Sequence, residues 1–326
     1  MLLICYGTRP EYLKVKPLME ALDRSQFKTL FTGQHVDLVD AAADYRIDII
    51  SGNNRLDSLV SSIMDSVKFE AEGINRVLVQ GDTTSAFAVA LSAFHHKIEV
   101  IHLEAGLRTY DLEQPYPEEA NRQMISRIAS LHLCPTELAK ERLLSEKVSG
   151  RIEVVGNTVL DNLRDVATSI EKKVLVTMHR RENHSDMKEW FLAIESLAQQ
   201  YSDCEFVLPI HPNPNVVKYK HILNHVKVVP PMPYQELVDY MSRTLFIVTD
   251  SGGIQEEAAF LKKPCLVCRK ETERSEGLNN FSLLCESPNL LAERVEQLRN
   301  LKLSGPCPYG DGETSQRIVD ILGQMG

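Results

Sequence analysis

The feature that most constrains this chain is the alternation of short apolar runs with helix-patterned segments along its whole length. Runs such as RVLVQ and LFIVTD lack polar alternation, which is typical of strands covered on both faces in a parallel sheet. Segments such as TTSAFAVALSAFHH carry helical spacing. The pattern predicts doubly wound α/β layers, with strands at residues 2–6, 28–32, 76–80, 98–103, 131–134, 152–155, 173–178, 205–209, 226–229, 245–249 and 264–268.

The predicted strands fall into two groups, and a chain of 326 residues suits two domains. The segment GNTVLDNLRDVATSIEK separates the groups, and the helix-like segment DGETSQRIVDILGQM is expected to cross back to the first domain. We therefore expect one domain of residues 1–157 with 309–326, and a second of residues 158–308. In such sheets ligands bind beyond the carboxyl ends of the strands.

Composition limits the class of partner. A net charge of -9 argues against nucleic acid or an anionic membrane as the main partner. No segment approaches the roughly 20 apolar residues of a membrane span. The pair Cys265 and Cys268 lies in a predicted buried strand without a second such pair, and HxH and HExxH are missing, so no metal site is expected. Scattered cysteines without a secretory signal suit a cytoplasmic protein.

Two strand-to-helix turns are candidate anion sites. In VTDSGGIQEEAAF, residues 248–260, Ser251, Gly252 and Gly253 open a helix whose N–H groups and dipole can bind phosphate. A capped helix after a tight turn explains the same residues. In YGTRPEYLK, Arg9 can bind a diphosphate through its guanidinium, unless it is a surface arginine. One such turn in each half suits a nucleoside diphosphate.

Carboxylates follow two predicted strands of the first half. Asp82 comes directly after VLVQG, and Glu104 ends VIHLE, 22 residues later. This is about the length of a strand-helix-strand unit, so the two should emerge side by side at one sheet edge. The segment PEEANR then supplies Glu118 and Arg122. A helix cap is the ordinary role of Asp82, whereas a carboxylate that ends a buried strand favours a function for Glu104.

Histidines follow two predicted strands of the second half. The motif HRREN supplies His179 and Arg180, and HPNPN supplies His211. A histidine beside arginines at a strand end is a candidate for acid-base or anion-binding work, although most single histidines are structural.

Ten motifs in order make the chain resemble one family over residues 6–322. They are GTRPE, GQH, QGDTTS, HLEAGLRT, PEEANR, VGNTVLD, HRREN, HPNPN, DSGGIQEEA and PYGDG. They resemble the non-hydrolysing UDP-N-acetylglucosamine (UDP-GlcNAc) 2-epimerases. The resemblance implies a GT-B-type fold, with two Rossmann-like domains facing each other across a cleft. It also implies an isomerase that inverts C2 of a UDP-2-acetamido sugar, converting UDP-GlcNAc to the N-acetylmannosamine (ManNAc) epimer, without cofactor or metal.

The resemblance further implies a set of site residues. The matching acid-base positions are Asp82, Glu104, Glu118 and His179. The matching UDP or substrate contacts are Arg9, Arg122, His211, Leu237, Ser251, Gly252, Gly253, Glu257 and Arg274. The reaction implied is elimination of UDP to a 2-acetamidoglucal, followed by its re-addition. This chemistry requires acid-base groups and a firm hold on the diphosphate.

Some bacterial members bind a second UDP-GlcNAc as an activator, and four positions match that pocket: Lys14, Gln34, Arg180 and His211. The chain departs from these members at Asp37, where they tend to carry an amide, in a short loop after the GQH segment and in a short connection before KKVLVTMHR. HRREN is followed by HSDMKEW in place of a stretch that contains Gly and Pro. These departures leave both retention and loss of activation open. The family resemblance also favours a homodimer.

Other readings share parts of this pattern. Related 2-epimerases act on UDP-2,3-diacetamido-glucuronate or on 6-deoxy sugars with the same core residues. A hydrolysing 2-epimerase shares the elimination step. A GT-B glycosyltransferase would not require three carboxylates, and a non-catalytic UDP-sugar-binding protein would tolerate their loss.

Overall fold

The computed structural model describes residues 1–34, 43–50, 52–69 and 73–325. The chain divides into two compact units, Met1–Asn162 with Tyr309–Gly326, and Leu163–Pro308. The division lies five residues beyond the boundary expected from the sequence. Asn162 Nδ2 donates to the Leu13 carbonyl oxygen at 3.1 Å, which holds this segment in the first unit.

The first unit contains a parallel sheet of seven strands in the order β3-β2-β1-β4-β5-β6-β7. Its topology reverses between β1 and β4, which is where α/β sheets of this kind bind ligands. The strands are β1 (Leu2–Tyr6), β2 (Phe27–Phe31), β3 (Tyr45–Arg46), β4 (Arg76–Gln80), β5 (Glu99–Leu103), β6 (Leu131–Cys134) and β7 (Arg151–Val154).

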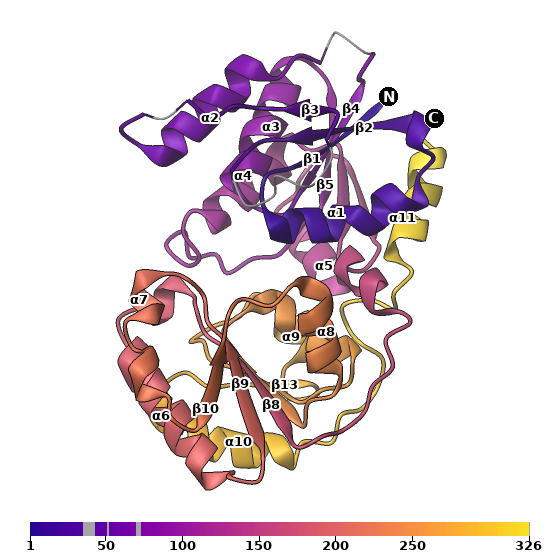
Figure 1. The fold of residues 1–326 in the computed structure, drawn as a ribbon. Helices are drawn as coiled ribbons and strands as arrows, with labels where there is room; N and C mark the ends of the chain where they lie inside the picture. Colours follow the sequence, from indigo (N-terminus) through magenta and orange to yellow (C-terminus); the bar gives the residue numbers. More distant parts are fainter. Residues whose placement is uncertain (35–42, 51, 70–72, 326) are drawn as a thin grey trace. The chain divides into compact units, whose positions relative to one another are not determined.

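Helices cover both faces of this sheet, as the continuous apolar strands predict. Leu3 and Cys5 of β1 pack with α2, α3 and α4 on one face, whereas Ile4 and Tyr6 pack with α1 and α11 on the other (Figure 1). The helices are α1 (Arg9–Ala21), α2 (Arg55–Ser66), α3 (Thr84–His95), α4 (Glu118–Ile128), α5 (Glu137–Ser145) and α11 (Thr314–Gly323), with short 3₁₀ helices η1 (Arg24–Gln26) and η4 (Thr158–Leu163).

The second unit repeats this plan with a parallel sheet of six strands in the order β10-β9-β8-β11-β12-β13. The strands are β8 (Lys173–Thr177), β9 (Glu205–Pro209), β10 (Val226–Val229), β11 (Phe246–Thr249), β12 (Cys265–Val267) and β13 (Ser282–Leu284). The helices are α6 (Met187–Gln200), α7 (Pro214–Val217), α8 (Tyr234–Ser242), α9 (Gly252–Phe260) and α10 (Leu291–Arg299), with 3₁₀ helices η5 (Arg181–Asn183), η6 (Lys220–Ile222), η7 (Ser275–Gly277) and η8 (Pro288–Leu290).

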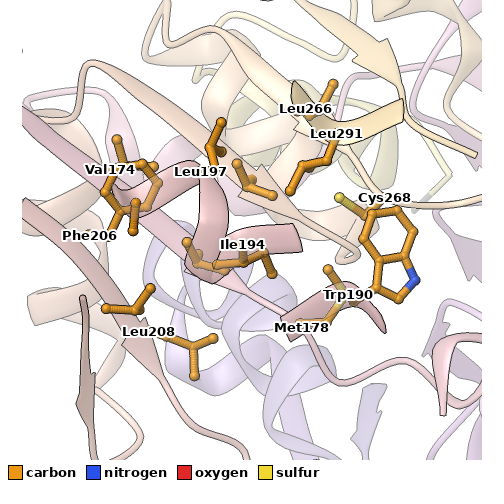
Figure 2. Packing of buried hydrophobic residues seen from close by; sticks show 14 of the residues in the cluster. Val174, Met178, Trp190, Ile194, Leu197, Phe206, Leu208, Leu266, Cys268 and Leu291 are labelled. Carbon is orange, nitrogen blue, oxygen red and sulfur yellow. The ribbon is translucent and has the colours of Figure 1, made fainter. Parts of the chain in front are cut away.

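The core of the second unit forms under α6 and α10. Trp190 and Ile194 of α6 pack among strand residues such as Phe206, and Cys268 lies in the same cluster (Figure 2). Burial raises the pKa of the Cys268 thiol well above its usual value. Among the described helices, none combines the length and apolar content needed to cross a membrane.

Candidate functional site

The first unit presents its acidic residues at the carboxyl ends of two paired strands. Gln80 of β4 is in register with Leu103 of β5, and the amide of Gly81 donates to the Leu103 carbonyl at 2.9 Å. Asp82 and Glu104 therefore leave the sheet from neighbouring strands, as the 22-residue spacing predicts.

Glu104 is held in a defined position by several donors. Its carboxylate accepts hydrogen bonds from Lys14 Nζ and Gln80 Nε2, and from Asn157 Nδ2 at 3.5 Å. The residue is buried, and its φ of 65° is uncommon outside glycine. Such a conformation persists only where the surroundings fix it, and it is found preferentially at functional sites.

Asp82 is more open than Glu104. Its side chain is 26% exposed, and its Oδ2 is paired with Arg122 Nη2. The Asp82 carbonyl accepts a hydrogen bond from Asn121 Nδ2 at 3.0 Å. Arg122 also contacts Glu119 Oε2 at 3.2 Å. This arginine, expected to support an anion site, therefore already pairs with two carboxylates of its own unit.

The adjacent acids at the start of α4 have different surroundings. Glu119 is fully buried and accepts hydrogen bonds from the amides of Thr109 and Tyr110, both at 3.1 Å, so it anchors the loop that follows β5. Glu118 is half-buried at the first position of α4. Of the pair, Glu118 is thus the less buried residue.

The turn between β1 and α1 is closed by a carboxylate of the same helix. Glu11 Oε2 accepts the amides of Gly7 and Thr8 at 2.8 and 2.7 Å, and Thr8 caps the helix in return. Glu11 Oε1 accepts the Thr83 hydroxyl at 2.6 Å. These amides are engaged within the chain, so the contribution of this turn to an anion site rests on the exposed side chain of Arg9.

The turn before α9 differs, because no side chain caps it. Ser251 occupies the N-cap position but makes no side-chain capping hydrogen bond. The first-turn amides of an α-helix have no partner within the helix, and they attract anions. The Ser251 hydroxyl thus does not cap the helix, and anion binding at this turn stays a prediction.

Arg274 lies directly against the start of α9. A Cβ built on Gly252 would lie 2.5 Å from Arg274 Nη1, so position 252 requires glycine for this approach. Arg274 Nε donates to Glu256 Oε1 at 2.8 Å, and Nη1 donates to Glu273. Arg269 continues the network through Glu273 Oε2 at 3.0 Å. Buried ion pairs of this kind fix the guanidinium in place.

His179 lies at the end of β8, next to Asp250 at the end of β11. The imidazole Nδ1 is 3.5 Å from Asp250 Oδ1. The ring of His179 stacks on that of His211, with centroids 5.3 Å apart and an interplanar angle of 13°. His211 Nδ1 accepts the amide of Asn213 at 3.1 Å, which leaves its Nε2 as the protonated nitrogen in the neutral form.

Burial lowers the pKa of His179, and Asp250 acts in the opposite direction. The positive charge of Arg180 and the neighbouring His211 and His184 lower this pKa further. Burial also lowers the pKa of His211. Neutral imidazole is therefore favoured at both positions near pH 7, and it can accept a proton.

Two further predicted contacts lie on α8 and α9. Glu257 is buried in α9, where its Oε1 accepts the Tyr234 hydroxyl at 2.8 Å. Leu237 lies within α8, and its amide donates to the Pro233 carbonyl at 3.0 Å. This amide is therefore already engaged within the helix.

The four positions matched to an activator pocket belong to different units. Lys14 and Gln34 lie in the first unit, where Lys14 pairs with Glu104 and Gln34 Oε1 accepts the Ser85 hydroxyl at 2.7 Å. Arg180 and His211 lie in the second unit. Asp37 lies outside the described residues.

Two residues of the site were not predicted from the sequence. Asp250 stands immediately before the predicted Ser251 and Gly252. Glu11 stands in GTRPE, two residues after the predicted Arg9. The signal that could have found Glu11 is the Thr-x-x-Glu capping box.

Comparison with known proteins identifies the family. A family model described as UDP-N-acetylglucosamine 2-epimerase matches residues 20–323. The chain belongs to the UDP-N-acetylglucosamine 2-epimerase family. The UDP-N-acetylglucosamine 2-epimerase of Neisseria meningitidis serogroup A is 38% identical over 98% of both chains, and that of Campylobacter jejuni is 36% identical over 98% of this chain and 97% of the relative. The alignment with the N. meningitidis relative spans 373 positions, whereas this chain has 326 residues. This chain is therefore shorter than that relative within the aligned region.

Solved structures agree with this assignment. The UDP-GlcNAc 2-epimerase from N. meningitidis bound to UDP-GlcNAc superposes with a TM-score of 0.88 at 35% identity, covering 99% of both chains. The enzyme from Methanocaldococcus jannaschii in complex with UDP-GlcNAc and UDP gives 0.83 at 31% identity, also covering 99% of both. A sucrose-phosphate synthase at 13% identity and a TM-score of 0.64 shares the fold alone. The predicted GT-B-type architecture of two Rossmann-like units is confirmed.

Proposed function

We propose that this protein is a non-hydrolysing UDP-GlcNAc 2-epimerase, which interconverts UDP-GlcNAc and UDP-ManNAc. The observation that carries the proposal is the pair Asp82 and Glu104 at the ends of neighbouring strands in a member of this family. The relatives named above are UDP-N-acetylglucosamine 2-epimerases, and none of these names points to a modified sugar. We therefore favour UDP-GlcNAc over a diacetamido-glucuronate or 6-deoxy substrate.

The proposed reaction proceeds by elimination and re-addition. The C2 proton of the sugar has no adjacent carbonyl and is not acidic, so simple deprotonation is too slow. Loss of UDP from C1 together with the C2 proton gives a neutral 2-acetamidoglucal. Protonation of C2 from the other face and return of UDP to C1 give the epimer. This sequence needs groups that transfer protons and an environment that stabilises the departing diphosphate.

We assign the proton-transfer work to Asp82, Glu104, Glu118 and His179. Glu104 and Asp82 follow adjacent strands of the first unit, and Glu118 is the less buried of the two adjacent acids at the start of α4. His179 is favoured in its neutral form, in which it can take up a proton. Which of these groups is the acid and which is the base stays open.

We assign the UDP contacts to the uncapped start of α9 and the groups around it. Ser251, Gly252 and Gly253 offer a hydroxyl and amides to the diphosphate, and Arg274 supplies a fixed positive charge beside them. Glu257 is proposed to bind the ribose hydroxyls, and Leu237 the uracil through its backbone. Arg9, Arg122 and His211 complete the proposed set.

Several further expectations stay predictions. Binding of a second UDP-GlcNAc by Lys14, Gln34, Arg180 and His211 is one, and a homodimer and a cytoplasmic location are others. The activator can be tested by adding UDP-GlcNAc to an assay that starts from UDP-ManNAc. A rate of UDP-ManNAc conversion that increases when UDP-GlcNAc is added would indicate activation. A hyperbolic dependence of the rate on UDP-ManNAc, with UDP-GlcNAc acting only as a competitor, would exclude it.

The experiment that tests the function is incubation of the purified protein with UDP-GlcNAc in D₂O, followed by proton NMR. We expect UDP-linked ManNAc carrying deuterium at C2, because the C2 proton is exchanged with solvent during the reaction. Free ManNAc and UDP would identify a hydrolysing enzyme. Retention of the original hydrogen at C2 would exclude this mechanism, and turnover of only modified UDP-2-acetamido sugars would correct the substrate.

A further inference from the structure

The carboxylate of Asp250 has two oxygens with different surroundings. Oδ2 accepts the amides of His179 and Arg180, both at 2.8 Å, and Nδ2 of Asn183 at 3.1 Å. Oδ1 accepts no hydrogen bond from any described residue, although the side chain is fully buried. An unsatisfied buried carboxylate oxygen is costly, so its retention calls for an explanation.

The group that faces Oδ1 is the imidazole of His179, whose Nδ1 is 3.5 Å away. This separation is slightly longer than a hydrogen bond, and such contacts between catalytic groups often shorten when a ligand binds. The three bonds at Oδ2 fix the carboxylate relative to the backbone that carries the imidazole. Asp250 is thus aligned to accept a hydrogen bond from Nδ1–H and to leave Nε2 for the ligand.

We propose that Asp250 is a positioning residue that sets the tautomer of His179, with the proton on Nδ1, and stabilises the imidazolium formed when His179 takes a proton. A carboxylate behind a catalytic histidine acts in this way in enzymes that transfer protons through imidazole. This assignment rests on the proposed function, in which His179 takes part in proton transfer.

The charges around His179 determine how its titration responds to Asp250. Arg180 precedes η5, His184 follows it, and His211 follows β9; each of these disfavours the imidazolium, whereas Asp250 favours it. Removing the negative charge of Asp250 would therefore lower the pKa of His179 further. The limb of the pH-rate profile that belongs to His179 should move to lower pH.

Asp250→Asn separates the two roles of this carboxylate. The amide oxygen of asparagine can accept the three hydrogen bonds now made to Oδ2, so the loop after β8 keeps its anchor. The NH₂ group then faces Nδ1 and donates to it, which imposes the opposite tautomer. We expect kcat to fall by up to about 10⁴-fold, with KM and the Kd for UDP changed by no more than about threefold.

A matched control exists in the same unit. Glu195 contacts His225 Nδ1 through Oε1 at 2.6 Å and also accepts backbone amides, but it lies on α6, outside the proposed site. Glu195→Gln should leave kcat and its pH profile unchanged. Unchanged kcat in Asp250→Asn would overturn the proposal, as would an equal loss of kcat and UDP affinity, which would assign Asp250 to the loop alone.

The tautomer can be read directly in the unaltered protein by nitrogen-proton correlation NMR with labelled histidine, using His179→Gln to assign the signal. We expect Nδ1–H at neutral pH, and an Nε2–H tautomer would overturn the proposal even if the Asp250 variant fails to fold. Failure of the proposed function gives a different result from failure of this proposal. In that case the unaltered protein would not epimerise UDP-GlcNAc, whatever the tautomer of His179.

Discussion

The guanidinium of Arg274 occupies the space that a side chain at position 252 would need, since a Cβ on Gly252 would lie 2.5 Å from Nη1. Arg274 cannot easily move aside, because it is buried and paired with Glu256 and Glu273. The contact joins the start of α9 to a fixed positive charge.

Gly252→Ala should displace Arg274 from the start of α9 and weaken binding of UDP. We expect the affinity to fall by about tenfold or more, equivalent to at least about 1.4 kcal/mol, measured by isothermal titration calorimetry. Gly323→Ala is the matched control, because a Cβ there meets nothing within 4 Å. Equal UDP affinity in the two variants would remove Arg274 from the proposed anion site.

Asp82→Asn and Glu104→Gln should remove turnover while leaving the nucleotide bound. Each substitution keeps the shape of the side chain but removes its ability to take a proton. We expect kcat/KM to fall by about 10²- to 10⁴-fold in a coupled or NMR assay. The Kd for UDP should stay within about threefold. The exposed Glu137→Gln on α5 serves as control, and normal epimerisation by either test variant would refute the assignment.

Glu11→Gln should destabilise the first unit. The carboxylate accepts two amides through Oε2 and the Thr83 hydroxyl through Oε1, and a glutamine NH₂ cannot replace one of these acceptors. We expect the free energy of unfolding to fall by about 1–3 kcal/mol, measured by urea denaturation. Glu20→Gln, exposed on the same helix and paired with Lys16, should change it by less than about 0.5 kcal/mol. Equal losses in the two variants would contradict this role.

His102 should make the protein less stable in mild acid. Burial lowers the pKa of His102 to about 3, while its Nε2 faces the Gly81 carbonyl at 2.8 Å. Below the unfolded value of 6.5 the unfolded chain binds a proton that the folded chain does not. The unfolding free energy therefore falls with decreasing pH, by up to about 1.4 kcal/mol per unit from this residue.

Urea denaturation of His102→Gln between pH 7 and 5 checks this expectation. The amide of glutamine can donate to the Gly81 carbonyl but does not titrate, so the slope against pH should become shallower. Part of the slope should remain, because burial also lowers the pKa of His132 on the adjacent β6. The exposed His95→Gln should keep the full slope. An unchanged slope in His102→Gln would show that His102 is not the cause.

Most of the sheet could be predicted because each long strand is covered on both faces. The eleven predicted runs all form strands, with ends that differ by at most one residue. The two missed strands, β3 and β13, lie at sheet edges and contain two and three residues. Such segments are too short to show periodicity, and their pairing is decided by the neighbouring strand.

Site residues could be predicted where an ionisable side chain directly follows a strand in the sequence, as Asp82 and Glu104 do. Contacts that depend on the pairing of two strands distant in the sequence could not be predicted. Asp250 contacts His179 because β8 pairs with β11, which places Thr177 in register with Thr249. Thr177 and Thr249 are 72 residues apart, and the sequence alone does not reveal that their strands pair. The engagement of Arg122 by Asp82 and Glu119 likewise depends on the packing of α4.

The helix α11 returns to the first unit after the whole second unit has been traversed. Its Ile318 and Leu322 complete the apolar layer that contains Val15 and Leu18 of α1, and the carboxylate of Asp161 accepts its first amides. During synthesis on the ribosome, the second unit is therefore available in full before the first. The earliest-made unit must wait, with one face covered only in part, for residues translated some 160 codons after its last strand.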